Sequence, residues 1–235
     1  MLMVVALYIS ACATPVGVVR VDPRQVHAEL SASVLSTGNP SSFSALVLRR
    51  LSLYEQFHDR PDETLQQLHR GLLAQDDEDR LFALAELSFF HAENSGNRSY
   101  FLASAVYAYT FLFPEGLGTP PHPADSRLRL ALDLYSRAIT EGVASPDDET
   151  VLLKAGRYPL PFGALSVAAP EGDFLWAGYR MTHCVAMTNF AVRGLRNHYR
   201  HPGIGAPVSA MLVPTEGVQT ARCHCSNVLR SITAS

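Results

Sequence analysis

Residues 79–94 read DRLFALAELSFFHAEN and residues 99–113 read SYFLASAVYAYTFLF, and this pair of segments decides the fold. Both are largely apolar and carry alanine among leucine and aromatic residues. Because small residues let two helices approach closely, we predict a pair of packed antiparallel helices. The turn is expected at Ser95-Gly96-Asn97, and Pro114 ends the second helix. This hairpin is the expected core of the helical half.

Apolar residues recur at helical spacing on both sides of the hairpin. A first helix is predicted from Asp22 and Pro23, which suit the N-cap and the first helical position. Others begin at Ser41 or Ser42 and at Pro61, and a last helix covers 126–141. The residues expected to face the core are Val26, Leu30, Val34 and Leu35 in the first helix, Phe43, Leu46, Val47, Leu51 and Tyr54 in the second, Leu65, Leu68 and Leu72 in the third, and Leu128, Leu132, Tyr135 and Ile139 in the last.

The acidic run from Asp76 to Asp79 directly precedes the first helix of the hairpin. A helix N-terminus favours negative charge, and the run lacks the Asp-x-Asp-x-Asp-Gly spacing of a calcium loop. We therefore interpret it as a helix start.

After Gly142 the helical period is replaced by short apolar runs separated by glycine and proline. Strands are predicted at 151–153, 162–167, 174–176, 185–192 and 208–213. Helices followed by strands predict an α+β fold, with an antiparallel helical stack over 24–145, a boundary near 146 and a β-rich region over 146–214. Residues 215–235 are polar without a period, and we expect a disordered or aberrant tail.

The first twelve residues, MLMVVALYISAC, predict an exported lipoprotein. Nine apolar residues precede Ser10, Ala11 and Cys12, so Ile9, Ser10 and Ala11 form a lipobox and Cys12 is the expected lipidation site. A buried core strand is the alternative interpretation. Because no basic residue precedes Arg20, we expect the true start to lie upstream. Residues 1–12 are thus a predicted signal peptide and 13–23 a tether.

The predicted partner is the membrane, contacted through lipid on Cys12. No apolar run after residue 12 reaches the roughly 18 residues that a spanning helix needs, and a triacylated cysteine anchors firmly. Ala13 after the cysteine favours the outer membrane of a Gram-negative cell, facing the periplasm. A second expected partner is a protein bound by the helical region.

Composition limits the function classes further. Hydrophobic residues make up 47% of the 235 residues and charged residues 17%, which suffices for a sizeable core. With a formal net charge of −3 the chain has no basic surplus to attract phosphate backbones, so nucleic acid is not an expected partner. With Cys12 acylated, three cysteines remain, an odd number that cannot form a closed disulfide framework, and Cys184 is expected to be a buried small hydrophobe.

The sequence contains only weak matches to known catalytic and binding motifs. Gly-x-Ser-x-Gly does not occur, and Ser209 is its nearest imitation. The Gly203-Ile204-Gly205 stretch suits a turn as well as a phosphate loop. We predict no catalytic residue, no metal ligand and no cofactor. The remaining candidates, which we discount, are Cys223-His224-Cys225 as metal ligands, His183 with Cys184 as base and nucleophile, and His198 with His201 in a basic surface loop.

Five strings resemble the N-terminal region of large bacterial lipoproteins that continue into an α/β-hydrolase domain. They are ACATPVG at 11–17, SVLSTG at 33–38, DRLFALAEL at 79–87, YAYTFLFP at 107–114 and VRGLRN at 192–197. The resemblance covers roughly 11–214 and implies a helical region followed by the opening strands of a hydrolase sheet. In that family the nucleophile, acid and histidine lie further along, so none transfers to a residue here.

Three functions are compatible with these patterns. The leading hypothesis is a lipid-anchored bacterial envelope protein that is catalytically inert as written and uses its helical region for packing or partner binding. The second is the N-terminal fragment of an esterase or lipase of the α/β-hydrolase family. The third, a helical-repeat-like adaptor, predicts a concave surface on the helices of 41–141.

Overall fold

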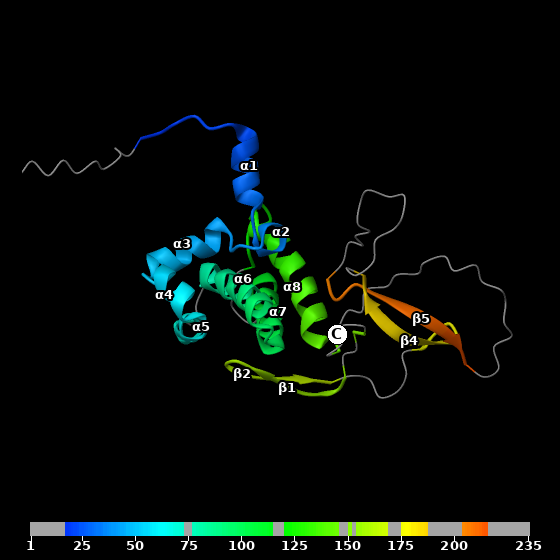
Figure 1. Cartoon of the computed structure of the whole chain (residues 1–235). Coiled ribbons are helices and arrows are strands. Elements are labelled where there is room, and N and C mark those ends of the chain that lie inside the picture. Colours follow the sequence, from blue (N-terminus) through cyan, green and yellow to red (C-terminus); the bar gives the residue numbers. More distant parts are fainter. Residues whose placement is uncertain are drawn as a thin grey trace, which may run out of the picture.

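The protein is an α+β chain in which helices precede strands (Figure 1). The computed structural model describes residues 17–72, 77–114, 120–145, 150–151, 154–168, 175–187 and 204–215. Within these ranges the elements are α1 (Pro23–Ser31), α2 (Val34–Thr37), α3 (Ser42–Arg50), α4 (Tyr54–Asp59), α5 (Pro61–Arg70), α6 (Glu78–Ser95), α7 (Arg98–Leu112), α8 (Arg127–Val143), β1 (Gly156–Leu160), β2 (Gly163–Val167), β3 (Leu175–Trp176), β4 (Tyr179–Ala186) and β5 (Val208–Pro214).

Helix α6 forms the centre of the helical body, which we define as α2–α8. Residues 82–89 are buried without a break, because α6 is covered by α3, α5, α7 and α8. Its N-cap is Asp77, whose carboxylate accepts a hydrogen bond from the Arg80 amide at 3.1 Å, which confirms the acidic run as a helix start. Gly96 ends the helix with φ of 69°, a left-handed conformation that glycine adopts without strain. The predicted hairpin is confirmed.

Helix α8 packs closely along α7. A Cβ atom on Gly142 would lie 2.6 Å from Leu102 Cδ2 and 3.3 Å from the Leu102 backbone nitrogen, so this glycine permits the close approach. The most buried face of α8 carries Ala131, Leu134 and Ala138. The four residues predicted to face inward, Leu128, Leu132, Tyr135 and Ile139, are half-buried at the edges of that face and pack against the core.

Two of the predicted helices have wrong boundaries. The first predicted helix is split, because Ala32 and Ser33 are extended and Ser33 caps a separate helix, α2. The second ends at Arg50 rather than continuing to Tyr54, since Ser52 adopts a positive φ of 58°. Leu46, predicted to face the core, is 64% exposed, because it lies on the outer face of α3.

The strands form two antiparallel sheets, β1-β2 and β3-β4-β5. The predicted strands at 162–167, 174–176 and 208–213 are confirmed as β2, β3 and β5. Of the strand predicted at 185–192, residues 185 and 186 are the end of β4, and residues 188–192 lie outside the described ranges. The sequence did not predict β1 or the first six residues of β4, because both stretches have few apolar residues. Val151 forms an isolated bridge with Ala144, and residues 152–153 lie outside the described ranges.

A second, smaller hydrophobic cluster, which we call the joint, packs the strands against the helices. Its buried members come from α7, α8 and β4 and from the bridge residue Val151. Half-buried residues of β1 and β5 pack against it. The Arg98 guanidinium also donates to the carbonyl of Ala144, just after α8 ends. The buried members are Leu102, Val143, Val151 and Ala186.

Candidate functional site

The lipobox Ile9, Ser10, Ala11 and the lipidation site Cys12 lie outside the described residues, which begin at Gly17. Residues 17–22 have no regular secondary structure and are exposed, and α1 then begins with Asp22 accepting a hydrogen bond from the Arg24 amide at 2.9 Å. Each described side chain of α1 is exposed. The predicted tether therefore leads into a helix that stands away from the helical body (Figure 1).

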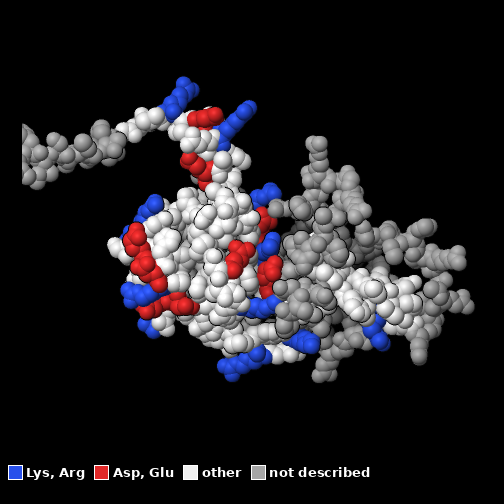
Figure 2. All heavy atoms as spheres, viewed as in Figure 1, with Lys and Arg blue, Asp and Glu red and all other residues white. Residues whose placement is uncertain are grey.

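Charged side chains of both signs lie along this projecting segment (Figure 2). Arg20 and Arg24 alternate with Asp22 and Glu29, and Gln25 donates to Glu29 at 2.9 Å one turn further along. The exposed segment thus has little net charge.

One group of titratable and aromatic side chains lies where α5, α6 and α7 meet. We call Asp62, His69, His91, Tyr100, Tyr107 and Phe162 the aromatic–histidine cluster. Asp62 Oδ1 lies 3.0 Å from His91 Nε2 and accepts a hydrogen bond from the Tyr100 hydroxyl. The imidazole of His91 also meets the Tyr100 ring edge-on, with centroids 4.5 Å apart. One carboxylate therefore links three helices.

The second half of the cluster centres on His69. Its Nδ1 lies 2.8 Å from the Tyr107 hydroxyl oxygen. On its other side the imidazole stacks on Phe162, with ring centroids 4.9 Å apart and planes 14° from parallel. Phe162 sits at the turn between β1 and β2 and also meets the edge of Tyr100. Through Phe162 the β1–β2 hairpin therefore contacts both α7 and α5.

Protonation states in the cluster follow from burial and hydrogen bonding. The hydrogen bond from Tyr100, and after it the charge of His91, lower the pKa of Asp62 although its partial burial opposes this. Burial raises the pKa of Tyr107, and burial with the bond to Asp62 raises that of Tyr100. Both phenols keep their protons and can serve as hydrogen-bond donors.

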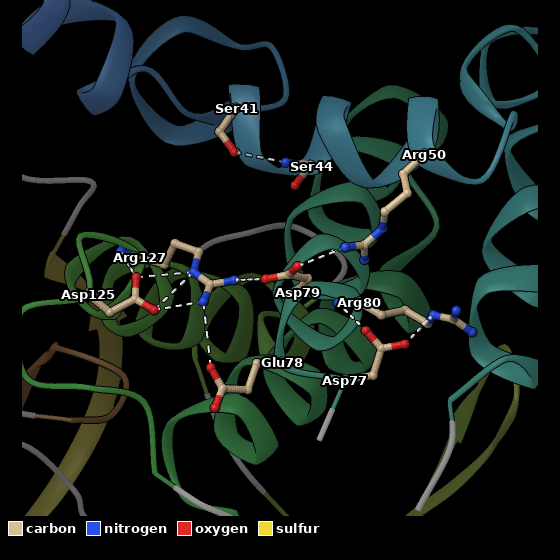
Figure 3. Close-up of polar contacts among 9 residues, drawn as sticks. All are labelled: Ser41, Ser44, Arg50, Asp77, Glu78, Asp79, Arg80, Asp125 and Arg127. Carbon is tan, nitrogen blue, oxygen red and sulfur yellow. Dashed lines mark hydrogen bonds and ion pairs between the residues drawn. The ribbon is translucent and has the colours of Figure 1, made fainter. Parts of the chain in front are cut away.

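A second polar network surrounds Arg127 at the start of α8 (Figure 3). Its guanidinium is 2.6 Å from Asp79, 2.7 Å from Asp125 and 3.6 Å from Glu78. It also lies over the ring of Phe111, 5.3 Å from the centroid. The Arg127 side chain is only 13% exposed.

The contact between Arg127 and Asp125 shifts the pKa of both groups. The hydrogen bond from Arg127 lowers the pKa of Asp125, and the reciprocal bond raises the pKa of Arg127. Arg50 on α3 reaches the other oxygen of Asp79 at 3.1 Å (Figure 3). The network therefore holds the N-terminal ends of α6 and α8 and the last turn of α3 together.

A third network is fully buried and centres on Glu86 of α6. One carboxylate oxygen accepts from the hydroxyls of Ser41 and Ser44, each at 2.5 Å, and the other accepts from the Val34 amide at 3.1 Å. Buried carboxylates need such partners, because desolvation is otherwise costly. Glu86 thus fixes α2 and the start of α3 onto α6.

Sequence reasoning missed all three networks, because each joins residues of several helices. One signal was present: Asp62 and His69 on α5, and Tyr100 and Tyr107 on α7, are each seven residues apart, the spacing that returns to the same helix face.

The discounted sequence candidates are dispersed in the structure. Ser209 pairs with Val185 in the β4–β5 ladder. His183 is exposed, and its neighbour Cys184 is half-buried rather than fully buried as predicted, since it lies on a thinly covered sheet. Partial burial raises the pKa of the Cys184 thiol. Gly203, His198, His201 and residues 223–225 lie outside the described ranges.

Within the described parts of the chain, no group of three or more His, Cys, Asp or Glu side chains is placed to hold a metal ion. None of the described helices has the length and hydropathy to cross a bilayer.

Comparison with family models, with curated proteins and with solved structures finds no match to this chain. The resemblance to large lipoproteins with a hydrolase domain therefore stays a prediction.

Proposed function

We propose that this is a bacterial envelope protein, anchored by lipid on Cys12, whose helical body packs against or binds a protein partner. The anchor holds the protein at the outer membrane, facing the periplasm. The observation that carries the proposal is the segment 17–31, whose described side chains are all exposed and which separates the lipobox sequence from the helical body.

The dimensions of that segment suit a spacer. The six residues 17–22 can reach at most about 20 Å, at roughly 3.3 Å each, and the nine residues of α1 add about 14 Å at 1.5 Å each. A body held in this way clears the lipid headgroups while it stays close to the bilayer.

The partner-binding part of the proposal is supported by the construction of the helical body. Its three polar networks fix α2, α3, α5, α6, α7 and α8 relative to one another. A surface that is rigid before binding loses less conformational entropy when a partner arrives. The aromatic–histidine cluster brings a carboxylate, two imidazoles and two phenols together, and the β1–β2 hairpin covers it with Phe162.

Metabolic labelling with radioactive palmitate tests the anchor. We expect label in the wild-type protein and in Cys184→Ser, and none in Cys12→Ser. Fractionation should place the labelled protein in the outer membrane and Cys12→Ser in the soluble fraction. Label on Cys12→Ser, or an unlabelled wild-type protein that keeps residues 1–11, would contradict the proposal.

A second candidate function is that the chain is the N-terminal part of an α/β-hydrolase-type esterase or lipase. Two features favour this alternative. The five sequence strings given above resemble those lipoproteins, and a helical region is followed by the antiparallel strands β3, β4 and β5. Under this alternative these strands open the hydrolase sheet. Hydrolysis of a short-chain p-nitrophenyl ester tests whether the 235-residue chain is catalytically inert, and we expect no turnover above buffer. A Gly-x-Ser-x-Gly motif in the reading frame continued past residue 214 would separate the two proposals and favour the enzyme.

A further inference from the structure

Strand β5 lies beside β4 at one edge of the β3-β4-β5 sheet (Figure 1), and within the described ranges β4 is its only ladder partner. An edge strand presents unpaired N–H and C=O groups on its outer side, and these can pair with a strand of another chain. Proteins commonly block such edges with charged residues, but β5 reads Val-Ser-Ala-Met-Leu-Val-Pro and has no charged side chain. The described part of the chain therefore leaves a neutral, apolar edge open.

The backbone groups of β5 alternate between β4 and the open edge. The carbonyl oxygens of Pro207 and Met211 accept hydrogen bonds, at 2.9 and 3.3 Å, from residues of β4 or directly after it. The Thr215 amide donates at 3.0 Å to the residue just before β4. These three residues have odd numbers, and in an antiparallel ladder alternate residues direct their backbone groups to opposite sides. The residues whose N–H groups point to the open edge are therefore Val208, Ala210 and Leu212.

The side chains of β5 become more exposed away from the joint. Val208 is half-buried against the joint, whereas Met211, Leu212 and Val213 are 58%, 40% and 42% exposed. These three side chains are consecutive, so they form one apolar patch at the edge rather than scattered exposed residues. Apolar patches of this kind mark interaction sites.

The open edge of β5 is complementary to itself. Met211 is the middle residue of the strand. When two copies run antiparallel about a two-fold axis at Met211, the N–H of Ala210 meets the carbonyl of Leu212 in the second copy, and the reverse. The Val208 N–H meets the carbonyl of Pro214, which has no N–H that would need an acceptor. Since β5 is uncharged, the pairing brings no like charges together.

We propose that this protein forms a dimer in which β5 pairs edge to edge with β5 of a second copy, antiparallel and about a two-fold axis at Met211. The two three-stranded sheets then make one continuous sheet. The two Met211 side chains lie beside each other on the axis, at a pair of residues that is not hydrogen-bonded and whose side chains therefore approach closely. Because the joint lies at the start of β5, the antiparallel pairing places the two helical bodies at opposite ends of the combined sheet.

This inference goes beyond the proposed function, since it assigns a second copy to the strand region rather than a partner to the helical body. It is independent of Cys12, so the palmitate experiment and the tests below fail separately.

Sedimentation of the 235-residue chain in a mild detergent tests the dimer, because detergent separates copies that are held together only by lipid. We expect the wild-type protein to have twice the mass of one chain. Met211→Lys should raise the dissociation constant at least about tenfold, since it places two like charges side by side on the axis. Met211→Glu should do the same, and an equimolar mixture of the two variants should regain the dimer.

Two matched controls change an exposed leucine to lysine elsewhere. Leu175→Lys lies on β3, at the other edge of the same sheet, and Leu46→Lys lies on α3; both leucines are 64% exposed, and both variants should keep the dimer. A monomeric wild-type protein, a dimer that Met211→Lys does not weaken, or a mixture that stays monomeric would overturn the proposal. So would a control that weakens the dimer as much as Met211→Lys does.

Amide hydrogen exchange tests the register of the pairing. The amides of residues 208, 210 and 212 should exchange at least about tenfold faster in Met211→Lys than in the wild-type protein, while those of 209 and 213, which face β4, keep their rates. Unchanged rates at the three outward amides would contradict the pairing. Protection of these amides in a monomer would assign the edge to another segment of the chain and overturn the dimer. If Met211→Lys does not fold, Leu212→Pro replaces it, since it removes one outward N–H and no hydrogen bond to β4.

Discussion

The helical body and the strand region differ most in how much apolar surface they bury. Among the described residues, the main core contains 24 buried hydrophobic residues, all from the helical body or the turn before α4, whereas the joint contains four. Buried apolar area is the dominant favourable term in folding. The stability of the protein therefore resides in the helices, and the strands depend on the joint for their attachment.

The two regions also differ in how their polar groups are used. In the helical body, Glu86, Arg127 and Asp62 each link helices far apart in the chain. In the strand region, most described side-chain hydrogen bonds are short-range or at exposed positions. Apolar packing and polar contacts therefore both stabilise the helical body. Substitutions in the helical body should lower the free energy of unfolding more than those at the attachment of the strands.

The largest effect is expected from Phe89→Ala, since this ring is fully buried in α6. The cavity and the lost transfer free energy should lower the free energy of unfolding by about 4 kcal/mol. Leu46→Ala, at an exposed position of α3, should change it by less than about 0.5 kcal/mol. Urea unfolding followed by circular dichroism measures both, and equal losses would contradict the placement of the core in α6.

Glu86→Ala should come next, with a loss of about 3 kcal/mol, because it leaves the Ser41 and Ser44 hydroxyls and the Val34 amide buried without their acceptor. Glu86→Gln keeps one acceptor oxygen and should lose roughly half as much. Urea unfolding followed by circular dichroism also measures these two losses. A Gln variant as unstable as the Ala variant would indicate that volume and charge matter more than the accepted hydrogen bonds.

Leu102→Ala probes the joint and should cost about 2 kcal/mol, the low end for a buried leucine, because a small cluster at a region boundary can relax. The distinctive readout is hydrogen exchange: β4 and β5 should exchange faster than in the wild-type protein, while residues 82–89 keep their rates. Uniform acceleration across both regions would show that the joint belongs to the main core.

The smallest effect concerns Asp62, whose side chain is 68% exposed. Because its pKa in the folded protein is lowered, its contacts stabilise the fold above the ordinary aspartate pKa of about 3.9, and the contribution is lost as the pH falls below that value. Tyr100→Phe removes the principal contact and should cost less than about 1 kcal/mol at pH 7. The difference from wild type should shrink at pH 3, and a difference that grows in acid would contradict the shift.

Local patterns predicted the helical hairpin to within one residue at each end. The expected segments 79–94 and 99–113 correspond to α6 and α7, because the caps at Asp77, Gly96 and Asn97 act within one helical turn. The same rules failed at Ser33 and Ser52, where the chain breaks a run that is helical by pattern. At Ser33, the break turns the Val34 amide towards Glu86, a residue 52 positions away.

The candidate site was less predictable than the fold. The proposed lipobox at Cys12 is a linear signal, so it is predicted from adjacent residues alone. Asp62, His91 and Tyr100 lie on three helices, and nothing within one helical turn of any of them indicates the other two. Phe162 was assigned to a strand, but the ring that it contacts is 93 positions away, since His69 lies on α5.

By itself, the sequence determined where most helices begin and end and which hairpin is central. These features depend on residues within a turn or a strand of one another. The tertiary structure alone decided which polar groups share the interior and where the β1–β2 hairpin docks. Such contacts join distant residues, and they form only when the packing of the helices brings those residues within a few ångströms.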